Sequence, residues 1–276
     1  MRILDKKTLM ETPTERVTQM KIFSPDVAAK ALPGQFVVLM VSPNGERVPL
    51  TVVETDVKTG AVTIIFQEVG FSTKLLGKLN AGDSLFAFVG PLGHATEIKK
   101  YGKVILVGGG VGIAEIYPVA KALKEKGNHV VTILGARTKQ LLILEPELRS
   151  CSSELQITPD GGSLGRKGFT TDVLGELLSK DSYEIVYAVG PLPMMKKVAM
   201  TTKGFGVKTV VSLNSLMVDG TGMCGGCRVT VGNEIKFTCV DGPEFDAASV
   251  DWDELGKRTR MYVDKEKHLC KLLINP

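Results

Sequence analysis

Residues 103–138 place the strongest constraint on the fold of this chain, because they read strand, glycine turn, helix and strand without a break. The segment KVILVGGGVGIAEIYPVAKALKEKGNHVVTILGART begins with an apolar run that has no alternating polar positions. Such a strand is buried on both faces, which is typical of a parallel sheet covered by helices. The pattern therefore predicts a βαβ unit and an α/β domain around it.

The same alternation of apolar strands and helices continues to about residue 215. Helices are expected at 171–180 and 193–204, and strands at 183–191 and 208–213. Helices that alternate with apolar strands favour a parallel sheet, so residues 98–215 are expected to form one parallel-sheet α/β domain.

The segment that precedes this domain has a different period. Residues 1–97 contain short β-rich runs separated by Pro and Gly: ERVTQMKIF (15–23), GQFVVLMVS (34–42), LTVVETD (50–56), AVTIIFQEV (61–69) and DSLFAFVG (83–90). Short strands at this spacing predict a small antiparallel barrel or sandwich.

Residues 216–276 form a third segment, glycine-rich at first, then acidic, and then basic with a helical pattern. A segment of this size buries too little apolar surface to be stable alone, and such segments depend on a metal or on a partner surface. The 276 residues thus fit two ordinary domains and a small C-terminal segment.

Charge and hydropathy narrow the possible partners. The 34 Lys and Arg residues and 30 Asp and Glu residues give a net charge of +4, with no basic block that would indicate nucleic-acid binding. No run of about 18 apolar residues predicts a membrane span, and the N-terminus does not resemble a signal peptide. We therefore expect a cytoplasmic protein with no membrane or nucleic-acid partner.

Three of the five cysteines fall within one short stretch, with the spacing Asp219-x4-Cys224-x2-Cys227-x11-Cys239. Plant-type ferredoxins bind a 2Fe–2S cluster through C-x4-C-x2-C and a distant fourth Cys, so only the first ligand differs here, a carboxylate in place of a thiolate. The spacing predicts these four residues as ligands of a 2Fe–2S cluster. The alternative is a tetrahedral zinc site, for which the same four side chains are adequate.

The remaining reactive side chains are scattered. Cys151 and Cys270 have no His or second Cys close in sequence, which indicates structural or inert thiols. The three histidines, His94, His129 and His268, form no pattern with a nucleophile, so we expect no catalytic acid–base residue.

The glycine turn at 108–112 is a candidate phosphate site. Amides at the start of a helix bind a pyrophosphate, and Gly110 and Gly112 allow it to approach; the alternative is a turn that is merely tight. Ala136 and Arg137 follow the next strand, and Asp160 lies in a later turn. Asp160 is expected to accept hydrogen bonds from a ribose and to favour NAD over NADP, unless it serves only as a turn residue.

Two further phosphate-binding candidates lie in the first segment. Arg47 in ERVPLT can pair with a diphosphate, and the turn VGFSTK offers backbone amides. Taken alone, both are compatible with ordinary surface residues.

Taken together, RVPLT, GFSTK, GPLG, VGGGVGIAEIYP, GARTKQLLILEPEL, VGP and the cysteine cluster resemble the ferredoxin–NADP reductase superfamily over nearly the whole chain. The resemblance implies an FAD-binding barrel, an NAD-binding domain and a cluster-binding segment. It implies that the flavin ring and phosphate arm are held by Arg47, Pro49, Leu50 and Thr51, and the FAD pyrophosphate by Gly70, Ser72 and Thr73. It assigns the nicotinamide dinucleotide to Gly110, Gly112, Ala136, Arg137, Asp160, Gly190 and Pro191.

The sequence departs from the family pattern at two places. Pro49, Leu50 and Thr51 stand where many relatives have an aromatic residue followed by Ser. Glu115 stands where many reductases have proline in the nucleotide loop.

Within the superfamily, the resemblance extends to two groups of subunits with a C-terminal 2Fe–2S cluster. One is the electron-transfer subunit of dihydroorotate dehydrogenase, which carries four cysteines; the other is the small subunit of NADH-dependent reduced ferredoxin:NADP+ oxidoreductase, also described as sulfide dehydrogenase. Asp219 favours the second group.

That likeness implies a bifurcating complex with a larger subunit that carries another flavin and 4Fe–4S clusters, in a heterodimer or a larger assembly. NADPH would be oxidised at the partner, and electrons would be split between ferredoxin and NAD+. The alternatives are the dihydroorotate dehydrogenase subunit and, outside enzymes, a zinc-stabilised NAD-binding scaffold.

Overall fold

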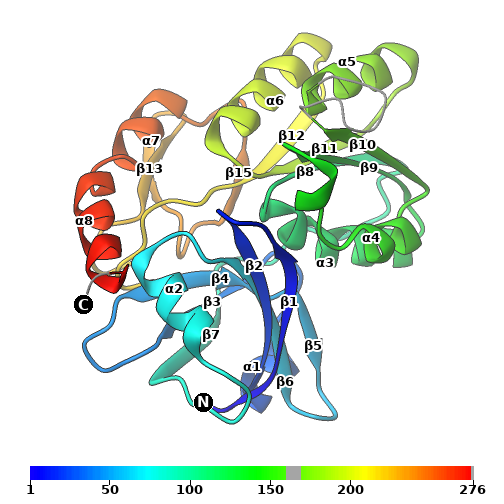
Figure 1. The fold of residues 1–276 in the computed structure, drawn as a ribbon. Helices are drawn as coiled ribbons and strands as arrows, with labels where there is room; N and C mark the ends of the chain where they lie inside the picture. Colours follow the sequence, from blue (N-terminus) through cyan, green and yellow to red (C-terminus); the bar gives the residue numbers. More distant parts are fainter. Residues whose placement is uncertain (160–168, 275–276) are drawn as a thin grey trace. The chain divides into compact units, whose positions relative to one another are not determined.

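The computed structural model describes residues 1–159 and 169–274, which divide into two compact units (Figure 1). Unit 1 comprises residues 1–93, 214–241 and 251 onward, and unit 2 comprises residues 94–213 and 242–250. The chain therefore passes between the units four times.

Unit 1 contains two antiparallel sheets with a shared core. One has the order β1-β2-β6-β5 and the other β4-β3-β7. Their bounds are β1 Ile3–Glu11, β2 Arg16–Phe23, β3 Phe36–Met40, β4 Arg47–Thr51, β5 Glu54–Asp56, β6 Ala61–Gln67 and β7 Ala87–Leu92. Apolar side chains from both sheets and from helix α2 (Phe71–Lys78) fill the core, among them Met20, Leu39, Ile64 and Leu76. The helix α1 (Pro25–Lys30) connects β2 to β3.

The cysteine segment packs on the β4-β3-β7 sheet of unit 1. Cys227 and Cys239 share a small core with Phe36 and Val38 of β3 and with Met217. The hairpin of β13 (Arg228–Val231) and β14 (Glu234–Phe237) lies between the two cysteines, and the helices α7 (Trp252–Arg258) and α8 (Val263–Ile274) follow. The cysteine segment thus uses the first sheet domain as the apolar support that it lacks by itself.

Unit 2 is built on a six-stranded sheet with the order β10-β9-β8-β11-β12-β15. The strands are β8 Lys103–Gly109, β9 His129–Ala136, β10 Glu154–Pro159, β11 Ile185–Val189, β12 Lys208–Ser212 and β15 Glu244–Asp246. All neighbours are parallel except β15, which pairs antiparallel with β12. From β8 the chain winds outward to β9 and β10, and it then resumes at β11 on the other side of β8.

Helices cover both faces of this sheet. The helix α3 (Gly112–Glu125) packs with α4 (Glu145–Cys151), and α5 (Thr170–Lys180) packs with α6 (Leu192–Phe205) on the opposite face, as Figure 1 shows. A one-turn 3-10 helix, Lys139–Leu141, lies between β9 and α4. This is a doubly wound α/β domain, which confirms the parallel-sheet prediction.

The predicted antiparallel strands of the first segment are also confirmed, except that the run 50–56 is divided between β4 and β5, which belong to two separately hydrogen-bonded sheets. The division into units differs from three consecutive segments, because 214–241 packs with the first sheets and 242–250 adds β15 to the parallel sheet. Within the described residues, none of the helices has the length and apolar character needed to cross a membrane.

Candidate cofactor and cluster sites

The four predicted cluster residues all belong to the loop and hairpin that pack on β3, and two of them, Cys227 and Cys239, are in contact. Cys227 and Cys239 are each only 2% exposed, and their Sγ atoms are 3.1 Å apart. Cys224 is exposed and lies on the same loop. Gly220 permits the loop to approach β3 closely, since a Cβ there would lie 2.8 Å from Cγ2 of Val38.

Backbone amides point toward the sulfur atom of Cys224. The Gly226 amide donates to Cys224 Sγ at 3.4 Å and is the main cause of a lowered pKa for this thiol, with the amides of Asp219 and Val218 acting in the same direction. Amide hydrogen bonds to thiolate sulfur are a common outer-shell feature of iron–sulfur sites. These amides favour the thiolate form of Cys224, which is the form that binds a metal.

Burial acts in the opposite direction on Cys239, and raises the pKa of this thiol. A metal ion displaces such a proton when it binds, because only the thiolate is a ligand. Cys227 and Cys239 therefore form a buried pair, whereas Asp219 is half-buried and Cys224 is exposed. No three His, Cys, Asp or Glu side chains of the described residues converge as they would around a single metal ion.

Asp219 is held by three donors. Its Oδ1 accepts from Nη1 of Arg47 at 2.9 Å, and its Oδ2 accepts from the amide of Thr221 at 3.1 Å and from the Thr221 hydroxyl. The Thr221 hydroxyl is the largest cause of a lowered pKa for this carboxyl, and Arg47 contributes to it. Asp219 is consequently an ionised oxygen donor on the cysteine loop.

The contact between Arg47 and Asp219 joins two predicted sites. Arg47 is the first residue of β4, and Pro49, Leu50 and Thr51 follow on the same strand as half-buried residues. In the register of the sheet, Pro49 lies opposite Val38 of β3. The strand predicted to hold the flavin therefore runs beside the strand that supports the cysteine loop.

The start of α2 binds carboxylates in this structure. The amide of Phe71 donates to Oε1 of Glu266 at 2.6 Å, and the hydroxyl of Ser72 donates to Oε2 of Glu46 at 2.5 Å. Thr73 Oγ1 accepts from the amide of Gly70 at 3.0 Å. Two carboxylates, one at an amide and one at a hydroxyl of the same helix start, are stand-in anions, and the GFST turn thus fits the diphosphate of FAD.

In unit 2, the predicted dinucleotide residues gather at the carboxyl edge of the sheet. Gly110 and Gly112 connect β8 to α3, and Gly190 and Pro191 follow β11. Gly112 is required by packing, because a Cβ there would lie 2.6 Å from the carbonyl oxygen of Val189. β8 and β11 are the neighbours at which the winding direction reverses, and dinucleotides bind at this point of doubly wound sheets.

Two other predicted contacts lie at the same edge. Ala136 ends β9 one strand away from β8, and Arg137 is the next residue. Asp160 lies outside the described residues, so its assignment to the adenosine ribose stays a prediction.

Three residues of these sites were not predicted from the sequence: Glu46, Arg258 and Glu266. Glu46 stands directly before Arg47, and no sequence pattern indicates that it contacts Ser72. Nη2 of Arg258 donates to the carbonyl of Gly226 at 2.9 Å, and Glu266 reaches α2 from 195 residues away. Charged residues of a helical tail are normally solvated, so no sequence pattern distinguishes Arg258 and Glu266 from their neighbours.

Comparison with known proteins also distinguishes a nucleotide-binding part of the chain from a cluster-binding part. Residues 106–200 match the oxidoreductase NAD-binding domain, and residues 214–251 match the iron–sulfur cluster binding domain of dihydroorotate dehydrogenase B. A Thermotoga maritima protein, described as a homolog of the dihydroorotate dehydrogenase B (NAD(+)) electron transfer subunit, is 51% identical over 92% of this chain and 89% of its own length. The corresponding subunit of Geobacillus thermodenitrificans is 35% identical over 86% and 93%.

Solved structures extend the comparison. A chain from the structure of NADH-dependent reduced ferredoxin–NADP oxidoreductase, studied for flavin-based electron bifurcation, is 48% identical, with a TM-score of 0.92 over 99% of this chain and 98% of that one. Ferredoxin–NADP+ reductase from Plasmodium falciparum is 14% identical, with a TM-score of 0.59 over 73% of this chain and 88% of that one, and shares the fold.

Proposed function

Because the chain belongs to the family of dihydroorotate dehydrogenase B electron-transfer subunits, within the ferredoxin–NADP reductase superfamily, we propose that it moves electrons between NAD(H) and a 2Fe–2S cluster with FAD as the intermediate carrier. When bound, FAD exchanges a hydride with a nicotinamide and single electrons with an iron–sulfur centre. The protein's own residues bind and orient these groups, and none of them is required as a catalytic acid or base.

The observation that carries this proposal is the 2.9 Å contact between Arg47 and Asp219. Arg47 begins the strand to which we assign the flavin, together with Pro49, Leu50 and Thr51. Asp219 belongs to the ligand set. This ion pair places a candidate flavin-binding residue next to a candidate cluster ligand, and the transfer of electrons between the two cofactors requires that they be close.

The ligand set divides in the way that a two-iron cluster needs. A 2Fe–2S cluster takes two protein ligands on each iron. We assign the buried pair, Cys227 and Cys239, to one iron and the pair Asp219 and Cys224 to the other. Gly70, Ser72 and Thr73 are assigned to the pyrophosphate of FAD.

In unit 2, we assign the nicotinamide dinucleotide to the loops at the carboxyl edge of the sheet. The proposed residues are Gly110, Gly112, Ala136, Arg137, Asp160, Gly190 and Pro191. Asp160 would repel a 2′-phosphate and so favours NAD over NADP.

We further propose that the chain is the small subunit of a bifurcating complex, with a larger partner that carries a second flavin and 4Fe–4S clusters. The 48% identity with a chain of NADH-dependent reduced ferredoxin–NADP oxidoreductase supports this assignment, as does Asp219. Electrons from NADPH at the partner would then be divided between ferredoxin and NAD+. The cytoplasmic location expected from the sequence is part of the same proposal.

Purification of the protein from its native cells tests whether the larger partner subunit exists. We expect a larger flavin-containing and iron-rich subunit to co-purify, and its identity can be established by mass spectrometry. Isolation of the chain alone from its native cells, at low salt and without oxygen, would contradict the proposed complex.

The second candidate function is electron transfer to a dihydroorotate dehydrogenase, favoured by the match of residues 214–251 and by the 51% identical relative. The same purification distinguishes the two, because this candidate requires a partner with one FMN and with dihydroorotate-oxidising activity.

A visible spectrum separates both enzymes from a zinc-stabilised scaffold. We expect flavin absorption at about 450 nm with broad iron–sulfur absorption at longer wavelength. A colourless protein that contains zinc and lacks iron and acid-labile sulfide would overturn the cluster assignment.

A further inference from the structure

The helix α7 is fixed firmly to the hairpin that lies between Cys227 and Cys239. Asp251 caps the helix by accepting from the amides of Asp253 and Glu254 at 3.1 and 2.9 Å, and its own amide donates to the carbonyl of Thr230 on β13 at 2.9 Å. The amide of Thr230 donates to Oε2 of Glu254 at 3.2 Å. Figure 1 shows α7 beside β13. The position of the last turn of α7 is thereby set relative to the cysteine loop.

Arg258, in that last turn, reaches the cysteine loop directly. Its Nη2 donates to the carbonyl of Gly226 at 2.9 Å, and the side chain is partly buried. Gly226 lies between Cys224 and Cys227, and its amide is the one that donates to Sγ of Cys224 at 3.4 Å. One residue of the loop is therefore held from both sides, by a guanidinium at its carbonyl and by a sulfur atom at its amide.

This arrangement brings a permanent positive charge to the loop that carries the ligands. A guanidinium stays protonated at any pH at which the protein is folded. The potential of an iron–sulfur cluster depends on nearby charge and on hydrogen bonds to its sulfur atoms. A positive charge stabilises the reduced cluster more than the oxidised one, because the reduced form has one more negative charge.

We infer that Arg258 is a positioning residue of the 2Fe–2S site, which raises the reduction potential of the cluster by placing its charge at Gly226 and by fixing the amide directed at Cys224. The inference rests on the proposed cluster. Arg258 lies beyond residue 251, where the match to the iron–sulfur binding domain ends, so the family model does not include it.

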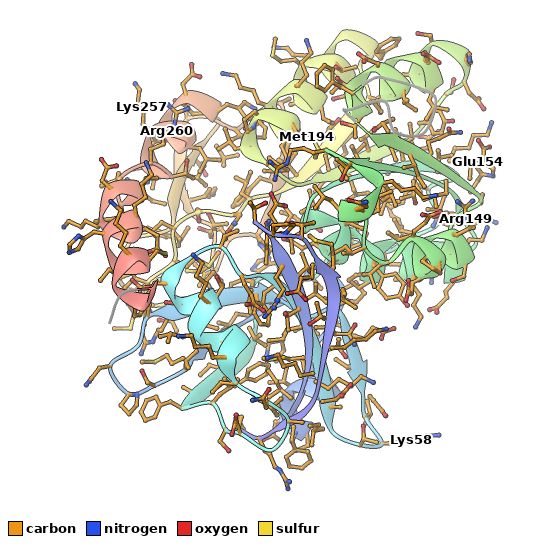
Figure 2. The ribbon with its side chains drawn as sticks, viewed as in Figure 1. Lys58, Arg149, Glu154, Met194, Lys257 and Arg260 are labelled. Carbon is orange, nitrogen blue, oxygen red and sulfur yellow. The ribbon has the colours of Figure 1, made fainter. Side chains whose placement is uncertain are left out.

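The chain offers matched controls for the charge. Lys257 and Arg260 (Figure 2) lie within two residues of Arg258 in sequence, are exposed, and have the same charge. Each can be replaced by Gln, as Arg258 can, with an identical change in net charge. A general effect of charge on the potential would be the same at all three positions, whereas the contact with Gly226 belongs to Arg258.

The experiment is a redox titration of the cluster in the full-length protein with its cofactors, followed by electron paramagnetic resonance, for wild type, Arg258→Gln, Arg258→Ala, Arg258→Lys, Lys257→Gln and Arg260→Gln. We expect Arg258→Gln and Arg258→Ala to lower the ratio of reduced to oxidised cluster at a fixed potential by about tenfold, which is about 59 mV for one electron. Arg258→Lys, which keeps the charge, should recover most of the potential.

Equal midpoints for Arg258→Gln and the two control variants would overturn the inference. Loss of the cluster from both Arg258→Gln and Arg258→Ala would also overturn it, in favour of a purely structural role. Iron and acid-labile sulfide in the wild-type protein are measured first, because their absence refutes the proposed cluster and not the contribution of Arg258 alone.

Discussion

At the scale of single residues, Asp219 combines two properties that a ligand to iron needs. Its carboxyl is kept ionised by the Thr221 hydroxyl and amide and by Arg47, and it lies on the same loop as Cys224. An oxygen ligand is harder than a thiolate and donates less charge to iron. The cluster should therefore differ in potential from one with four cysteines.

Replacement of Asp219 tests this role. Asp219→Cys should retain the cluster and lower its midpoint potential, because a thiolate donates more charge to iron. Asp219→Asn, which keeps the shape and removes the charge, should reduce cluster occupancy several-fold. Iron content and a redox titration measure both effects, and an Asp219→Asn protein with full iron content and an unchanged spectrum would exclude Asp219 as a ligand.

The sequence predicted the four candidate cluster residues because their spacing is local and resembles a known pattern. It did not predict that Arg47 contacts Asp219, because 172 residues separate them. The two residues meet because β4 pairs with β3 and the cysteine loop packs on β3. Arg258 and Glu266 were missed for the same reason: their partners are distant in sequence and their own neighbours give no signal.

At the scale of elements, most helices and strands of unit 2 were predictable, because an apolar strand or an amphipathic helix contains its own period; the short helix α4 was not predicted. The strand β1 was not predicted, since most of its residues are exposed and several are charged. It lies at the edge of its sheet, paired only with β2, where charged residues are common. The antiparallel β15 was also missed, because its three residues depend on β12 for their conformation.

The contact between α8 and α2 predicts competition with FAD. If the amide of Phe71 serves the FAD diphosphate, the carboxylate of Glu266 must leave it when the cofactor binds. Glu266→Ala should therefore bind FAD about fivefold to tenfold more tightly, or about 1 to 1.4 kcal/mol. Fluorescence titration of the flavin-free protein measures the dissociation constant.

Asp264→Ala is the matched control, because Asp264 lies on the same helix, carries the same charge and has a fully exposed side chain. A Glu266→Ala protein with the same FAD affinity as Asp264→Ala would contradict the competition.

At the scale of the whole molecule, the stability of unit 2 depends on a segment that follows the cysteines in sequence, residues 242–250 with strand β15. Glu244 of β15 is partly buried, and its carboxylate accepts from the hydroxyl of Thr96 at 2.6 Å. Burial raises the pKa of Glu244 from an ordinary 4.5 to about 7, although the Thr96 hydroxyl opposes the shift. The buried hydroxyl of Tyr187 is electrostatically coupled to it.

This raised pKa predicts how stability varies with pH. Between about pH 4.5 and about pH 7 the folded state holds a proton that the unfolded state has lost, so the free energy of unfolding falls as the pH rises through this window. The loss is at most about 3 kcal/mol. Glu244→Gln keeps the acceptor for Thr96 and should remove this part of the pH dependence. Denaturant titrations of both proteins across the window measure the difference; parallel curves would refute the assignment.

The neighbouring strands β12 and β15 also define where the cysteine segment leaves and rejoins the sheet. The amide of Leu213 donates to the carbonyl of Pro243 at 2.9 Å, so the two ends of the segment meet at one point. For protein engineering, the cluster-binding segment is thus an insertion in a hairpin. A short turn could replace it, or the segment of a relative with four cysteines could be exchanged for it, with the strand order of the nucleotide-binding sheet unchanged.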